Sequence, residues 1–140
     1  GQAPARQAAI SGGLPFSTGA TTINKMCGSG MKAVMLAFDL LMAESAEVIL
    51  AGGMESMTNA PYLLPKARQG YRLGHSTIYD HMYLDGLEDA YQKGLLMGVF
   101  ADETAKLYGM SRQVQDEFAM TSLNRAIEAN NNGTFLNEIV

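Results

Sequence analysis

The sequence has few of the residues that mark several common classes of protein. Its 140 residues contain one cysteine and two histidines, so an internal disulfide is excluded and no Cys/His cluster is available for structural zinc. No apolar run approaches the ~20 residues that a membrane-spanning helix requires. The formal net charge of −4 argues against a general nucleic-acid binder, which would show a basic face. These absences favour a reducing, intracellular setting.

The composition is that of one globular domain. Hydrophobic residues make up 47% and charged residues 17% of the chain, which is enough apolar surface for a core. The chain opens on Gly1 without a methionine or a targeting pattern. Residues 134–140 are expected to begin a strand. Both ends therefore suggest a piece of a longer protein.

The first third of the chain predicts a strand, a helix and a second strand. Residues 21–26 are rich in β-branched side chains, and residues 47–51 form a short apolar run. Between them, residues 29–43 are apolar nearly all round, which is typical of a helix buried on both sides. A βαβ unit of this size implies parallel strands. Cys27 and the loop 52–56 are therefore expected at one sheet edge, where such folds bind ligands.

The rest of the chain predicts an irregular excursion followed by two helices. Residues 59–77 contain basic residues and no acid, without a clear period. A helix is expected from Gly98 to Tyr108, ended by Gly109, and a second helix after Ser111 as its N-cap. Four acidic residues before these helices are interpreted as an exposed face: Asp80, Asp85, Glu88 and Asp89.

Cys27 is the main candidate for chemistry. A strand-to-helix turn projects the side chain at its apex, and Gly28 and Gly30 keep such a turn open and support it. A helix N-terminus can lower the pKa of a thiol, and its N–H groups can contribute to an oxyanion hole. Free cysteine is also among the most buried residue types. The spacing alone therefore leaves two interpretations open, a nucleophile and an inert core residue.

Longer motifs around this cysteine resemble a known family. Residues 24–33, Asn-Lys-Met-Cys-Gly-Ser-Gly-Met-Lys-Ala, are similar to the acyl-enzyme cysteine motif of thiolases, the acetyl-CoA acetyltransferases. Residues 51–61, Ala-Gly-Gly-Met-Glu-Ser-Met-Thr-Asn-Ala-Pro, resemble the second signature of that family. Residues 1–9 and 111–126 agree with it as well. The resemblance favours the nucleophile.

The resemblance implies an α/β fold of layers α/β/α/β/α, of which this chain holds only part. Residues 1–60 would belong to the N-terminal catalytic domain, residues 61–133 to a largely helical portion of the loop domain, and residues 134–140 to a following strand. The implied activity moves an acetyl group between acetyl-CoA and a second acyl-CoA through a thioester on Cys27, in acetoacetyl-CoA synthesis or thiolysis. Coenzyme A thioesters are then substrates, with no permanently bound cofactor and no metal.

Further expectations follow from the family and from the composition of the chain. Its members are usually homodimers or homotetramers, and neither nucleic acid nor a membrane is expected as a partner. The cytoplasm is the predicted location, with an organellar matrix as the alternative. Met97 lies where many thiolases carry a His-Met pair in the thioester pocket, although Leu96 replaces the histidine and core packing is the alternative for Met97. The basic residues Lys66, Arg68 and Arg72 are interpreted as a solvated loop, with coenzyme A phosphates or a neighbouring subunit as alternatives.

The sequence also departs from the family. It has no Gly-His-Pro, Asn-Glu-Ala-Phe or Cys-Gly-Gly-Gly motif, and so lacks the groups that would handle protons. His75 and His81 are wrongly spaced for two metal ligands on one helical face and receive no role. This chain alone is predicted to be inactive. Two other classes stay open: a condensing enzyme of the ketoacyl synthase type, and a non-catalytic interaction module with a structural cysteine.

Overall fold

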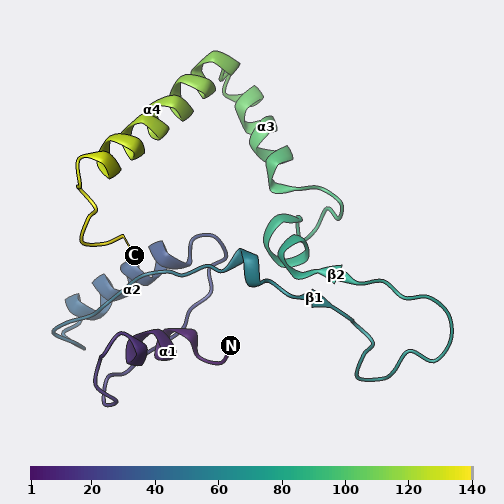
Figure 1. Ribbon diagram of the computed structural model, residues 1–140, viewed down its shortest axis with the longest axis horizontal. Helices are drawn as coiled ribbons and strands as arrows, with labels where there is room; N and C mark the ends of the chain where they lie inside the picture. The colour runs from purple at the N-terminus through teal and green to yellow at the C-terminus, as the bar shows by residue number, and fades with distance from the viewer. Residues whose placement is uncertain (140) are drawn as a thin grey trace. The chain divides into compact units, whose positions relative to one another are not determined.

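The computed structural model describes residues 1–139. The chain divides into two compact units, Gly1–Gly86 and Leu87–Val140, and each is described by itself (Figure 1). This division differs from the family-based boundary after residue 60, which stays a prediction. Among residues 1–139, no helix combines the length and the apolar character needed to cross a membrane.

The first unit begins with helix α1, Pro4–Ser11. Proline in the first turn suits a helix start because its missing N–H would have no partner there. Gly13, with φ +91°, ends the helix. The Arg6 guanidinium donates to the carbonyl of Phe16 at 2.7 Å and to that of Thr18, so the loop after α1 is held against the helix.

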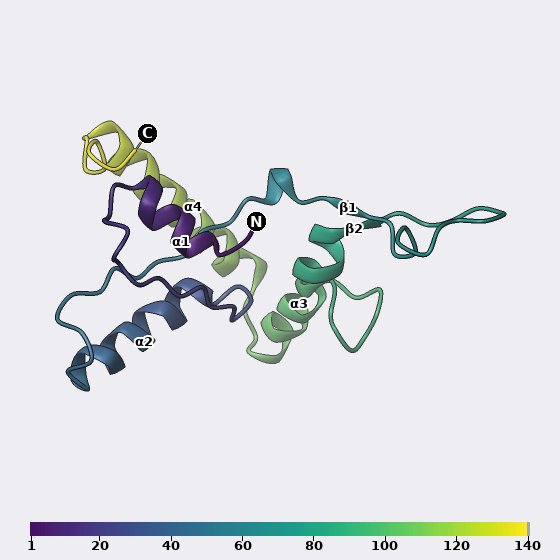
Figure 2. The same ribbon diagram turned by 90° about the horizontal axis from the view of Figure 1, so that it is seen from below.

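Helix α2, Ser29–Met42, confirms the long apolar helix predicted after Cys27. On one side of α2, Ala33 and Leu36 are half-buried, and Ala37 is the one buried residue that the described chain contains. After α2 the chain turns back and returns along the helix (Figures 1 and 2). The Met-rich side is exposed: Met31 is 74% and Phe38 63% exposed. The expectation that both sides are buried is therefore met only in part, around Ala37.

The two strands predicted on either side of α2 are not formed. Within residues 1–139, no backbone–backbone hydrogen bond begins or ends in residues 19–24 or 46–55. A strand exists through the ladder it makes with its neighbours, and the described residues supply no neighbouring strand for either segment. Their apolar, β-branched sequences are those of central strands. The expected βαβ unit is thus present as a helix between two unpaired segments.

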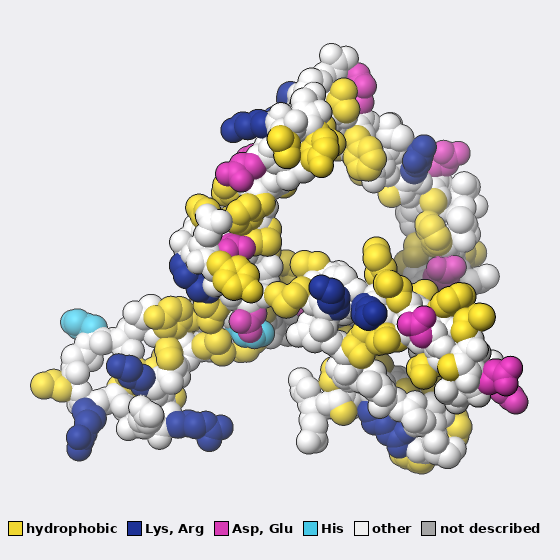
Figure 3. Space-filling model, turned by 180° about the vertical axis from the view of Figure 1, so that it is seen from behind, with side chains coloured by type: hydrophobic (Ala, Val, Ile, Leu, Met, Phe, Trp, Pro, Cys, Tyr) yellow, Lys and Arg dark blue, Asp and Glu magenta, His cyan; other side chains and the backbone are white. Residues whose placement is uncertain are grey.

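The strands that do pair form a small hairpin in the first unit. β1, Tyr62–Leu63, and β2, Tyr79–Asp80, are antiparallel, with Tyr62 opposite Asp80. A 3₁₀ turn, Met57–Asn59, precedes β1, and a π-helical turn, Tyr83–Leu87, follows β2. The long loop between the strands projects from the hairpin (Figure 2). Figure 3 shows basic side chains gathered at one end of the molecule. Those of the loop are exposed, as the sequence predicts, and form no ion pair with any residue in 1–139: Lys66, Arg68 and Arg72.

The second unit contains helices α3, Met97–Leu107, and α4, Arg112–Asn131. The Ser111 hydroxyl accepts the Val114 N–H at 3.2 Å, so the predicted N-cap is confirmed. Gly109, with φ +62°, follows α3 in the left-handed conformation typical of a helix end. The strand expected at 134–140 is not formed in the described part of that segment. Residues 132–138 are turns, in which Phe135 accepts the N–H groups of Glu138 and Ile139.

Candidate functional site

Cys27 lies at the turn that leads into α2. Its side chain belongs to the exposed class, and α2 begins two residues later, with Gly28 as the N-cap. An inert core cysteine would be enclosed by apolar side chains, and within this chain Cys27 is not. A thiol in this position is open to a substrate that approaches the N-terminus of α2.

Two polar side chains hold the turn in shape. The Ser29 hydroxyl accepts the Lys25 N–H at 3.0 Å and donates to the Met26 carbonyl at 2.7 Å. The Asn24 carboxamide oxygen accepts the Met26 N–H at 2.9 Å. The backbone on both sides of Met26 is therefore fixed by neighbouring side chains. Asparagine and serine commonly make such local bonds in turns, but neither residue stands out in the sequence as part of the site.

Met26 adopts a left-handed backbone conformation directly before Cys27. Its φ is +50°, which costs a residue with a Cβ about 1–2 kcal/mol. The bonds from Asn24 and Ser29 compensate for that strain. The consequence is a sharp change of direction one residue before the thiol, as a nucleophile at a turn requires.

The first turn of α2 presents unused hydrogen-bond donors beside the cysteine. Lys32 N–H bonds to the Gly28 carbonyl at 2.9 Å and Ser29 N–H to the Met26 carbonyl at 3.2 Å. The backbone N–H groups of Cys27, Gly30 and Met31 have no acceptor in the part of the chain that the structure describes. Such N–H groups at a helix start bind anionic or carbonyl oxygens.

The loop after residue 51 meets this turn, as the sequence predicts. The backbones of Gly53 and Gly30 are in contact: a Cβ placed on Gly53 would stand 3.1 Å from the Cα of Gly30. Farther along the loop, the Asn59 side-chain amide donates to the Ser56 hydroxyl at 2.8 Å. The two family-like signatures are therefore adjacent in space through their glycines.

The histidines lie in other parts of the first unit. His81 Nε2 is 2.7 Å from a carboxylate oxygen of Asp85, four residues along the chain, whereas Asp80 accepts the Met82 N–H. His75 is exposed in the loop between β1 and β2. No group of three His, Cys, Asp or Glu side chains within residues 1–139 is placed to hold a metal ion.

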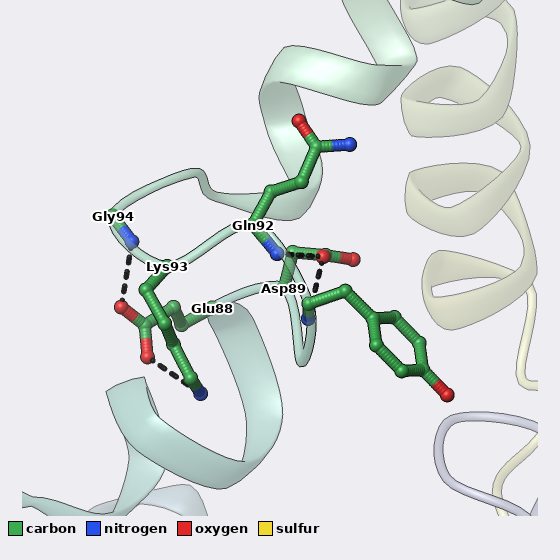
Figure 4. Close-up of polar contacts among 6 residues, drawn as sticks. Glu88, Asp89, Gln92, Lys93 and Gly94 are labelled. Atoms are coloured by element: carbon green, nitrogen blue, oxygen red, sulfur yellow. Dashed lines mark hydrogen bonds and ion pairs between the residues drawn. The ribbon is translucent and has the colours of Figure 1, made fainter.

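Met97 is the first residue of α3 in the second unit, where the residue is 42% exposed. The segment before it is a closed loop held by two carboxylates (Figure 4). Glu88 accepts the Gly94 N–H at 2.8 Å and pairs with Lys93 at 3.2 Å, and Asp89 accepts the Gln92 N–H at 2.6 Å and the Tyr91 N–H at 2.9 Å.

These bonds stabilise the charged forms of both carboxylates. The pKa of Glu88 lies below its ordinary value of 4.5, first because of the Gly94 N–H and further because of Lys93. The pKa of Asp89 lies below 3.8 because of the N–H groups of Gln92 and then Tyr91. The interpretation of Glu88 and Asp89 as a solvated face is thus incomplete: the Glu88 side chain is only 11% exposed.

Comparison with known proteins places the whole chain within one family. Residues 1–140 match the family described as thiolase, N-terminal domain. The chain is 52% identical to an acetyl-CoA acetyltransferase of Cupriavidus necator and 49% identical to acetyl-CoA acetyltransferase 1 of Arabidopsis thaliana. All of the chain aligns with 35% and 34% of these proteins, so it spans about a third of their length.

A solved structure agrees with these relatives. The crystal structure of the Acat5 thiolase from Ascaris suum in complex with coenzyme A matches with a TM-score of 0.86 at 35% identity. The match covers 100% of this chain and 36% of that one. The layered α/β fold class predicted from the motifs is confirmed by this likeness.

Proposed function

The chain belongs to the thiolase family, and we propose that its Cys27 accepts the acyl group in the full-length enzyme, an acetyl-CoA C-acetyltransferase. The observation that carries the proposal is the exposed thiol at a turn held by side-chain hydrogen bonds. Beside it, N–H groups at the start of α2 have no acceptor among the described residues. This arrangement combines a nucleophile with donors for the oxygen of a thioester.

The proposed first step exchanges one thioester for another. The Cys27 thiol gives up its proton to a base, which we propose lies in the remainder of the full-length enzyme. The sulfur then attacks the carbonyl carbon of acetyl-CoA, and the N–H groups of the turn stabilise the negative charge on the oxygen. The carbon–sulfur bond to coenzyme A breaks, the coenzyme A thiolate leaves and takes back the proton from that base, and Cys27 keeps the acetyl group. Gly28 and Gly30 support the turn, and Met97 is proposed to contact the acyl or pantetheine chain.

The second half of the reaction needs groups outside this chain. Forming a carbon–carbon bond requires a base that removes a proton beside a thioester carbonyl. We propose that the remainder of the full-length enzyme supplies it, and that this enzyme is a homodimer or homotetramer in the cytoplasm.

Intact-mass measurement on the full-length enzyme tests the assignment. After mixing with acetyl-CoA, we expect one added acetyl group on wild-type enzyme and none on Cys27→Ser. Acetylation that survives Cys27→Ser, or its absence from wild-type enzyme, would contradict the proposal. Acetylation by an acyl carrier protein thioester and not by acetyl-CoA would instead indicate a ketoacyl synthase type of enzyme. A thiol that alkylates only slowly at neutral pH and accepts no acetyl group would indicate a structural cysteine.

A further inference from the structure

We infer that Gly53 is a positioning residue for Cys27, acting through the backbone of Gly30. The inference rests on the proposed role of Cys27 and adds a residue to it. Gly30 belongs to the first turn of α2, three residues after the thiol, and Gly53 belongs to the loop that follows the returning segment.

The contact between the two glycines is close and unequal. A Cβ on Gly53 would stand 3.1 Å from the Cα and 3.3 Å from the nitrogen of Gly30. A Cβ on Gly30 would stand 3.5 Å from the same two atoms of Gly53, which is ordinary van der Waals contact. A Cβ on Gly52 would meet nothing within 4 Å among residues 1–139. Among Gly30, Gly52 and Gly53, only Gly53 has too little space for a side chain.

Backbone conformation does not require glycine at these positions. The positive-φ glycines of the described chain do not include residues 30, 52 or 53, so none of the three is glycine because of a left-handed φ. A methyl group on Gly53 would instead push against the Gly30 backbone, which is part of α2 and cannot rotate away as a side chain could. The loop and the helix start would therefore move apart by some tenths of an ångström.

That displacement matters because Cys27 and its neighbouring N–H groups belong to the same turn. An acyl transfer needs the sulfur and the hydrogen-bond donors in register with the thioester, and small misplacements lower rates steeply. Alkylation of the thiol by a small reagent needs only access and a thiolate. The rate of acetylation therefore reports how Cys27 is positioned, and the rate of alkylation reports only how exposed it is.

The test compares Gly53→Ala with Gly52→Ala in the full-length enzyme. Each variant is measured for the rate of Cys27 acetylation at saturating acetyl-CoA, the rate of alkylation by iodoacetamide, and the melting temperature. For Gly53→Ala we expect acetylation to slow by about ten-fold or more, with alkylation within about two-fold of wild type. Gly52→Ala is expected to stay within about two-fold in both reactions, because its methyl group meets no atom of the residues that the structure describes.

Equal acetylation rates in Gly53→Ala and Gly52→Ala would overturn the inference, and so would parallel losses of acetylation and alkylation in Gly53→Ala. Wild-type enzyme that is not acetylated would instead overturn the proposed function. If Gly53→Ala does not fold, hydrogen exchange in the wild-type enzyme tests the inference instead. Acetylation of Cys27 should then change amide hydrogen exchange in residues 52–56 but not in residues 12–17, the loop held by Arg6, and equal changes would overturn the inference.

Discussion

At the scale of single residues, the turn before α2 depends on the Ser29 hydroxyl. This group bonds to Lys25 and Met26 at 3.0 and 2.7 Å. We expect Ser29→Ala to lower the free energy of unfolding of the full-length enzyme by about 1–2 kcal/mol, since two hydrogen bonds are lost and the strain at Met26 is less well compensated. Chemical denaturation measures this change, and Cys27 acetylation should slow as well.

Ser17→Ala is the matched control for this prediction. Ser17 is exposed, and its hydroxyl makes no hydrogen bond to any described residue, so its removal should change stability by less than about 0.5 kcal/mol. A Ser29→Ala variant as stable and as readily acetylated as Ser17→Ala would show that the hydroxyl does not hold the turn.

Single residues were predictable from the sequence where their type has a strong local preference. Ser111 is an N-cap and Gly109 follows a helix end because few other residues suit those positions. Met26 gave no such signal: methionine has no preference for φ +50°, and only the bonds of its neighbours hold it there. The space requirement of Gly53 also depends on a residue more than twenty positions away in sequence.

At the scale of elements, the loop that leads into α3 is closed by ionised carboxylates. Because the pKa of Glu88 is lowered in the folded chain, the stability it contributes is fully present above the ordinary value of 4.5 and is lost as the pH falls through the lowered value. We expect Glu88→Gln to increase hydrogen exchange at the Gly94 amide several-fold at neutral pH. Wild-type enzyme should approach the variant on acidification.

Glu103→Gln serves as the control for the loop. Glu103 is exposed on α3 and makes no ion pair with any residue in 1–139, so its substitution should leave Gly94 exchange unchanged. Equal protection of Gly94 in Glu88→Gln and in wild-type enzyme at neutral pH would contradict the prediction.

Helices were predictable as elements, and strands were not. The apolar spacing and terminal signals place α2, α3 and the start of α4 within about two residues, since a helix satisfies its backbone from within. Residues 21–26 and 47–51 have strand-like sequences, but their hydrogen bonds must come from other strands. β1 and β2 have only two residues each, too few for a period-two pattern to be visible.

At the scale of the whole molecule, the chain exposes apolar surface that its sequence suits for burial, and it carries a nucleophile without the bases that its reaction needs. The side of α2 that carries Met31 and Phe38 is exposed, although its sequence is that of a buried helix. The thiol of Cys27 is likewise in place without the proton-handling motifs of the family. The sequence could predict the family fold because its motifs are long and specific, but it could not predict which surfaces this chain leaves uncovered.

The 140-residue chain by itself should therefore catalyse neither acetoacetyl-CoA synthesis nor its thiolysis. Carbon–carbon bond formation and cleavage require general acid–base groups, each worth about 10²–10⁴-fold in rate. Without them, an acetyl group on Cys27 could be lost only by hydrolysis. The measurement follows acetoacetyl-CoA in both directions with the purified chain, its Cys27→Ser variant and the full-length enzyme. Of these three proteins, we expect only the full-length enzyme to turn over acetoacetyl-CoA. Turnover by the chain above that of Cys27→Ser would show that residues 1–140 already hold a sufficient base.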